Sequence, residues 1–178
     1  MKTILSLLLF LLHIFAYSFS TQCSTTDQIK FLQCKGNIVK IQDLLALYVK
    51  TEEKIPPQSS FKNMSKLCNT ALVCVEQIQC AEAKKGVGLM ATACEGIEMS
   101  AGPFGDCMSK LQSKPPSSET YPCATMFQKD ALDSKSKRCK VFTEDAECVM
   151  RIAKDHCGSA AVDAYKKGVP SMKIMLRC

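Results

Sequence analysis

The cysteines have the widest choice of chemistry in this chain, because a thiolate can act as a nucleophile, bind zinc or form a disulfide. All twelve lie after residue 22: Cys23, Cys34, Cys68, Cys74, Cys80, Cys94, Cys107, Cys123, Cys139, Cys148, Cys157 and Cys178. An even number of cysteines behind an apolar leader is typical of a secreted protein whose thiols are oxidised in pairs. We therefore expect six disulfides, which would leave no thiol for catalysis or metal binding.

The histidine of Asp155-His156-Cys157 is the next candidate for chemistry. A histidine–aspartate pair is also found in secreted phospholipases A2, but their Cys-Cys-x-x-His-Asp helix and glycine-rich calcium loop are missing here. Neighbouring residues on a helix point about 100° apart, so Asp155 and His156 do not form a dyad by themselves. We expect His156 to lie at a helix C-terminus, where the helix dipole favours a cation. The chain is therefore predicted not to be an enzyme, with a secreted hydrolase as the remote alternative.

Metal ligands are poorly represented. Glu144, Asp145 and Glu147 crowd a predicted helix N-terminus, where carboxylates complement the dipole, and they lack the spacing of a calcium loop. Zinc would need thiolates or several histidines, and His13 and His156 are the only histidines. We expect no metal and no cofactor.

The densest positive charge is the run Lys135, Lys137, Arg138 and Lys140, in a chain of net charge +6. Such a basic patch could bind heparin-like glycans, anionic lipid or microbial surfaces. It could equally be the solvated face of a mildly basic protein. Nucleic acid is not an expected partner outside the cell.

Methionine is frequent, with nine residues of which eight, from Met64 to Met175, follow the leader. Its adaptable side chain allows two interpretations. One is a cavity between helices that carries lipids or other small hydrophobic molecules, and the other is ordinary core packing.

Residues 1–20 have the three parts of a signal peptide. Lys2 supplies the positive charge, Ile4 to Ala16 form the apolar stretch, and small residues predict cleavage at Ser18 or Ser20. The apolar stretch is shorter than the about 20 residues that cross a bilayer, and no later stretch is long enough. We expect a secreted, extracellular domain at residues 21–178. Asn63-Met64-Ser65 is a sequon that could make it a glycoprotein.

Apolar residues recur every three or four positions along this region, which predicts an all-α fold. We expect one disulfide-rich domain of about five to seven helices. The first, through Phe31 and Tyr48, can be capped by Ser24, Thr25 or Thr26, with Asp27 or Gln28 completing the capping box. Further helices are predicted at about 60–79, 87–97, 104–111, 143–157 with Thr143 as cap, and 160–167. The segment 123–139 is ambiguous, with Phe127 and Leu132 as its expected core residues.

Helix geometry restricts the disulfides. A helix rises about 1.5 Å per residue, so cysteines six apart are about 9 Å apart, beyond the roughly 7 Å between Cα atoms that a disulfide spans. The pairs excluded on this ground are Cys68–Cys74 and Cys148–Cys157, and also Cys23–Cys34 if the first helix is continuous between them. Cys94 and Cys107 flank a Gly-Pro turn and could pair across it. The remaining pairing stays open.

The cysteine spacing also suggests an internal repeat. Ser65-Lys66-Leu67-Cys68 is similar to Ser136-Lys137-Arg138-Cys139, and Cys74-Val75 is similar to Cys148-Val149. A duplicated half-domain would explain these similarities, and so would chance matches among many cysteines and lysines.

From Cys23 to Cys178 the chain resembles a nematode family of secreted twelve-cysteine domains, known as domain of unknown function nineteen. The resemblance rests on the cysteine order, the Cys68-x5-Cys74-x5-Cys80 and Cys139-x8-Cys148-x8-Cys157 triplets, Phe104-Gly-Asp-Cys107, and Tyr165-Lys166-Lys167 before a last cysteine. It implies a signal peptide, six bridges and one or two domain copies, here one. It implies no activity and no catalytic residues.

We therefore expect a non-enzymatic extracellular module that acts by binding, in a host-defence or environment-facing setting. A carrier of lipids or small hydrophobic molecules is the alternative, and it would need an enclosed apolar cavity of at least roughly a few hundred Å³. The expected partner is an extracellular protein, a glycan or a small hydrophobic ligand. The sequence does not choose among them and does not give the oligomeric state.

Overall fold

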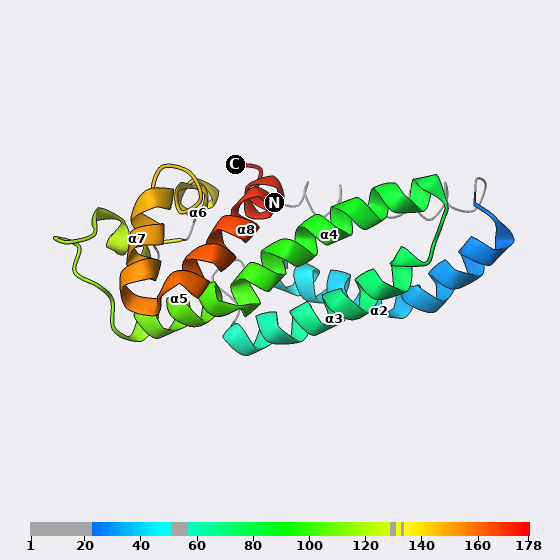
Figure 1. Ribbon diagram of the computed structural model, residues 1–178, viewed down its shortest axis with the longest axis horizontal. Coiled ribbons are helices and arrows are strands. Elements are labelled where there is room, and N and C mark those ends of the chain that lie inside the picture. Colours follow the sequence, from blue (N-terminus) through cyan, green and yellow to red (C-terminus); the bar gives the residue numbers. More distant parts are fainter. Residues whose placement is uncertain (1–22, 51–56, 129–130, 133) are drawn as a thin grey trace. The chain divides into compact units, whose positions relative to one another are not determined.

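The computed structural model describes residues 23–50, 57–128, 131–132 and 134–178 (Figure 1). The predicted signal peptide, residues 1–20, lies outside this range. Within it, the chain forms seven α-helices and one 3₁₀ helix, without a strand, and all twelve cysteines are paired. The all-α, six-disulfide prediction is confirmed.

The described part of the chain divides into two compact units, the first made from residues 23–50 and 63–94, and the second from 57–62 and the described residues of 95–178. The helices of the first unit are α2 (Thr25–Lys50) and most of α3 (Gln58–Glu76) and α4 (Ala81–Ala101). The second unit contains α5 (Pro103–Ser113), η1 (Pro122–Phe127), α6 (Lys135–Lys140), α7 (Ala146–Cys157) and α8 (Ser159–Leu176). Each unit has its own apolar cluster and three of the six disulfides.

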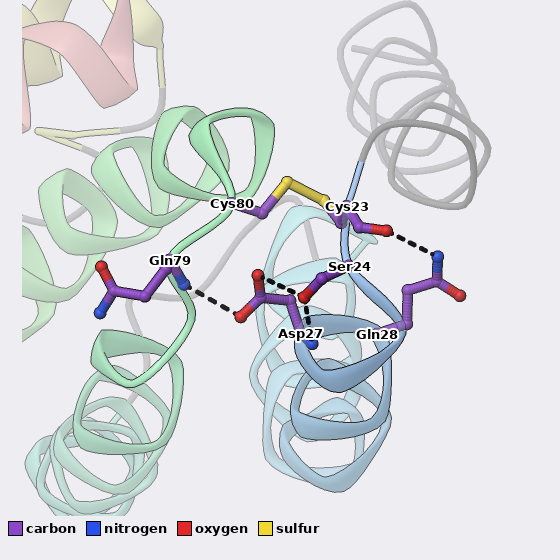
Figure 2. Close-up of a disulfide and its surroundings, with 6 residues drawn as sticks. All are labelled: Cys23, Ser24, Asp27, Gln28, Gln79 and Cys80. Atoms are coloured by element: carbon purple, nitrogen blue, oxygen red, sulfur yellow. Dashed lines mark hydrogen bonds between the residues drawn. A yellow bond between two sulfur atoms is a disulfide. The ribbon is translucent and has the colours of Figure 1, made fainter.

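In the first unit, Ser24 caps the start of α2, and Asp27 is bonded to it through the hydroxyl rather than through the backbone N–H of a complete capping box. The Asp27 backbone N–H donates to Ser24 Oγ at 3.1 Å, and that hydroxyl donates to Asp27 Oδ2 at 3.0 Å. Asp27 is buried, and its Oδ1 accepts the backbone N–H of Gln79 at 3.1 Å (Figure 2). Since Cys23 is bonded to Cys80, the same two segments are joined by a covalent bond and by a charge-assisted hydrogen bond.

The core of the second unit is built around Tyr165 of α8, which is 1% exposed. Its ring lies 4.9 Å from that of Phe104 and 6.1 Å from that of Phe142, and its hydroxyl donates to the Val141 carbonyl. Burial raises the pKa of Tyr165 well above its ordinary value of 10.0. Around these rings, Val149 and Ile152 of α7 are fully buried.

Helix α8 is longer than the predicted 160–167, because it continues through Gly168 and Pro170 to Leu176. Proline removes one helical hydrogen bond, but the residues on both sides of it are held by packing. Gly168 is buried so close to Met99 that a Cβ there would lie 2.4 Å from the Met99 Cβ. Ser171 is buried and donates to Glu95 Oε2 at 2.5 Å. These contacts keep the helix intact where its sequence predicts an end.

One other local prediction was wrong. Thr143 does not cap the following helix. Its hydroxyl donates to the Cys139 carbonyl at 2.9 Å, and α7 begins later, at Ala146.

Phe127 and Leu132, the expected core residues of the ambiguous segment, pack against the core of the second unit but are only half-buried. The small Ala124 of η1 is fully inside that core.

Every excluded disulfide is absent from the pairing: the bonds are Cys23–Cys80, Cys34–Cys74, Cys68–Cys94, Cys107–Cys157, Cys123–Cys148 and Cys139–Cys178. The suggested bond between Cys94 and Cys107 was wrong. Helix α4 continues beyond Cys94 to Ala101, which places Cys94 about 12 Å along the axis from the turn at Gly102.

Both units use the same disulfide connectivity. Counted in chain order within each unit, the first cysteine is bonded to the fifth, the second to the fourth and the third to the sixth. Six cysteines allow fifteen pairings, so agreement by chance would occur about once in fifteen cases. The similar Ser-Lys-x-Cys segments end at the third cysteine of each unit, Cys68 and Cys139, as a duplication requires. This connectivity favours the duplicated half-domain over chance.

Candidate functional site

The second unit has an open groove of about 670 Å³ where the start of α5 meets the junction of α7 and α8. The bond between Cys107 and Cys157 crosses it, with the Cα atoms 5.8 Å apart. The other lining residues are mainly charged: Pro103, Asp106, Lys110, Lys154, Asp155, His156 and Gly158. The groove therefore contains the histidine and aspartate that the sequence singled out.

Asp155 and His156 both turn toward Tyr121, which lies just before η1. The Tyr121 hydroxyl donates to Asp155 Oδ2 at 2.9 Å, and the His156 ring meets the Tyr121 ring edge-on with centroids 5.7 Å apart. The guanidinium of Arg151 lies over the same tyrosine ring, 5.3 Å from its centroid. Asp155 thus orients a tyrosine rather than the neighbouring imidazole.

One group in the groove and one beside it have shifted pKa values. The hydrogen bond to the Asp155 carboxylate raises the pKa of Tyr121, because it favours the protonated phenol. The ammonium of Lys62, 2.8 Å from Asp106 Oδ1, lowers the pKa of Asp106, and Gln58 adds a hydrogen bond at 3.1 Å. Tyr121 therefore stays neutral and Asp106 stays charged.

The residues that line the groove include neither a hydroxyl side chain nor a free thiol, since Cys107 and Cys157 are bonded to each other. Lys110 donates to the backbone carbonyl of His156 at 3.5 Å. Within the part of the chain that the structure describes, no group of three or more His, Cys, Asp or Glu side chains is placed to hold a metal ion.

The predicted basic patch is found on helix α6. Ser134 caps this helix by accepting the Lys137 backbone N–H at 3.3 Å. The side chains of Lys135, Lys137 and Lys140 are exposed, and Lys140 lies 3.5 Å from Glu144. Arg138 is half-buried and donates to the Leu132 carbonyl at 3.0 Å, so it also fixes the chain before the helix.

A disulfide brings further positive charge to this patch. Cys139 is bonded to Cys178, with 5.5 Å between their Cα atoms, and Arg177 directly precedes Cys178 (Figure 1 shows α6 and this end of α8). With about 3.8 Å between consecutive Cα atoms, the Cα of Arg177 lies within about 13 Å of the Cα atoms of Arg138 and Lys140. Lys173 is exposed one turn earlier, and its carbonyl accepts the Cys178 N–H at 2.9 Å.

We call these residues the α6–α8 basic surface: Lys135, Lys137, Arg138, Lys140, Lys173 and Arg177. Four of them were predicted from the sequence. Lys173 and Arg177 were missed because they are far from α6 in the chain, and only the pairing of Cys139 with Cys178 would have revealed them.

The sequon and the methionines have clear surroundings. Asn63 is exposed on α3 while Met64 is fully buried, so the predicted glycosylation site faces solvent. A Cβ added to Gly96 would meet the sulfur atoms of Met172 and Met175. Both methionines thus approach Gly96, but only Met172 packs against the core of the second unit, since Met175 is exposed.

A family model described as Domain of unknown function (DUF19) matches residues 23–178. This chain belongs to the DUF19 family. The DUF19 match starts at Cys23 and ends at Cys178, so it includes all six disulfides and both units. No curated protein and no solved structure matches the chain. In the described part of this DUF19 protein, no helix is both long enough and apolar enough to cross a membrane.

Proposed function

We propose that this DUF19 domain is a secreted, non-enzymatic module that binds an anionic partner through the α6–α8 basic surface. The observation that carries the proposal is the bond between Cys139 and Cys178, which joins the basic end of α8 to the basic helix α6. Two clusters that are separated in the sequence are thereby held close together in space.

The six disulfides support the extracellular setting, because such bonds persist in oxidising compartments. A host-defence or environment-facing role fits a domain whose two units are each closed by three covalent bonds. Such bonds limit the unfolded states that proteases attack.

The charge balance supports binding to an anion. Glu144 is paired with Lys140, but both side chains are more than half exposed, and exposed pairs of this kind contribute at most about 1 kcal/mol. A polyanion can therefore displace Glu144 at little cost. In the groove at His156, by contrast, Asp155 is bonded to Tyr121, Asp106 to Lys62, and Lys110 to a backbone carbonyl, which favours a structural role for these three side chains.

The proposal is tested with the secreted protein on three immobilised anions: heparin, polyglutamate and vesicles containing phosphatidylserine. We expect saturable binding to at least one of them at physiological salt, weakened by Lys135→Gln with Lys137→Gln. Absence of binding to all three would contradict the proposed site. Saturable hydrolase turnover that is abolished by His156→Ala would contradict the non-enzymatic role.

A further inference from the structure

We infer that the partner of the α6–α8 basic surface is a linear sulfated polysaccharide. This inference rests on the proposed function and names the chemical class of its partner. It is carried by the spread of the cations over two segments of the chain, by the predominance of lysine among them and by the small number of apolar side chains around them.

The positive charges are spread over two segments of the chain rather than gathered at one point. Helix α6 extends over six residues, about 9 Å, while Lys173 lies in the last turn of α8 and Arg177 is the left-handed residue that caps this helix. The disulfide between Cys139 and Cys178 joins these two groups of cations. A polymer with regularly repeated sulfates can contact both groups, whereas a small anion would use only one or two of their cations.

The cations are mostly lysines. Lysine presents a compact point charge with three rotatable donors, while arginine is preferred where a carboxylate is held in a bidentate fork. Of the two arginines, Arg138 already has its guanidinium on the Leu132 carbonyl. The surface therefore presents mostly rotatable point charges, which can adjust to anionic groups repeated along a polymer and do not need the planar geometry of a carboxylate.

The apolar side chains beside the α6–α8 basic surface are too few for insertion into a bilayer, which needs a broad apolar face. Ile174 is 62% exposed, but Met175 is only 38% exposed and its sulfur atom lies toward Gly96. The six residues also include no aromatic ring on which a nucleic-acid base could stack. A sulfated glycan is the linear polyanion that remains in an extracellular setting.

The test is the dissociation constant of the protein for heparin, measured over a range of NaCl concentrations. Each cation that displaces a condensed counterion adds about one to the slope of log Kd against log salt, as for other polyelectrolytes. We expect Lys135→Gln with Lys137→Gln to lower this slope by about two. Lys173→Gln with Arg177→Gln is a second variant that should have the same effect from α8.

The internal repeat supplies a matched control. Lys66 lies two residues before Cys68, as Lys137 lies two residues before Cys139, and both lysines are exposed. Lys66→Gln with Lys84→Gln removes the same charge from the first unit, and we expect the slope to stay unchanged. Circular dichroism confirms that each variant is folded.

The outcomes separate the two proposals. If the control variant lowers the slope as much as the α6 variant, or if desulfated heparin binds as tightly as heparin, the inference is overturned. Binding to phosphatidylserine vesicles or polyglutamate without binding to heparin would also overturn it, while leaving the proposed function in place. Binding to none of these anions would overturn both.

Discussion

Val75 and Val149 occupy equivalent positions in the two units. Each directly follows the fourth cysteine of its unit, Cys74 or Cys148, and each is at most 2% exposed. The equivalence continues one turn later, because Ile78 and Ile152 each lie four residues after that cysteine and are also buried. The repeated Cys-Val-x-x-Ile segment thus places a disulfide and two apolar side chains together in each core.

Shortening either valine should therefore destabilise the protein. We expect Val75→Ala and Val149→Ala each to lower the free energy of unfolding by about 2 kcal/mol, from lost apolar burial and the cavity left behind. Val73→Ala is the control, because Val73 is 61% exposed and should change stability by less than about 0.5 kcal/mol. Urea unfolding with the disulfides intact measures this, and an equal effect at Val73 would refute the equivalence in burial.

The helix cap formed by Ser24 and Asp27 gives a second prediction. Asp27→Ala removes the acceptor of the Gln79 N–H as well as the partner of Ser24, so we expect a loss of about 2 kcal/mol. Thr26→Ala, at an exposed neighbouring position, should have little effect. Hydrogen exchange of the Gln79 amide provides a direct readout, since it should become faster only in the Asp27 variant.

Tyr165 predicts a dependence on pH. Its pKa in the folded protein is above the 10.0 of an exposed tyrosine, so the unfolded chain loses the proton first. The stability that depends on this group is therefore complete below about pH 10 and declines as the pH rises further. We expect Tyr165→Phe to reduce this decline and to cost about 1–2 kcal/mol near neutral pH, since the Val141 carbonyl loses its donor. An unchanged alkaline decline in this variant would be inconsistent with burial of the phenol.

Two glycines should respond in opposite directions to alanine. Gly168→Ala places a methyl group 2.4 Å from the Met99 Cβ, and we expect destabilisation by about 1–3 kcal/mol. Gly88 lies in the exposed part of α4 with nothing within 4 Å of an added Cβ. Gly88→Ala should therefore stabilise the protein by about 0.5–1 kcal/mol through helix propensity. Thermal unfolding of the two variants would contradict this packing if their shifts had the same sign.

The sequence predicted those features that depend on neighbours in the chain. The apolar period predicted the helices, and the short range of a helix cap placed the start of α2 near Ser24, Thr25 or Thr26, of which Ser24 is the cap. Helix α8 was underestimated because its continuation through Pro170 depends on Met99 and Glu95, which are distant in the sequence. Lys173 and Arg177 were missed for the same reason, since only a disulfide connects them to α6.

The role of that disulfide is tested most directly by removing it. We expect Cys139→Ser with Cys178→Ser to weaken heparin binding roughly tenfold. Without the bond, the cations of α6 and those at the end of α8 are no longer held together and bind as separate sites. Cys68→Ser with Cys94→Ser removes the equivalent bond of the first unit and should leave the dissociation constant unchanged for the folded protein. Equal losses in the two variants, or unchanged affinity without the Cys139–Cys178 bond, would contradict a basic surface assembled by this bond.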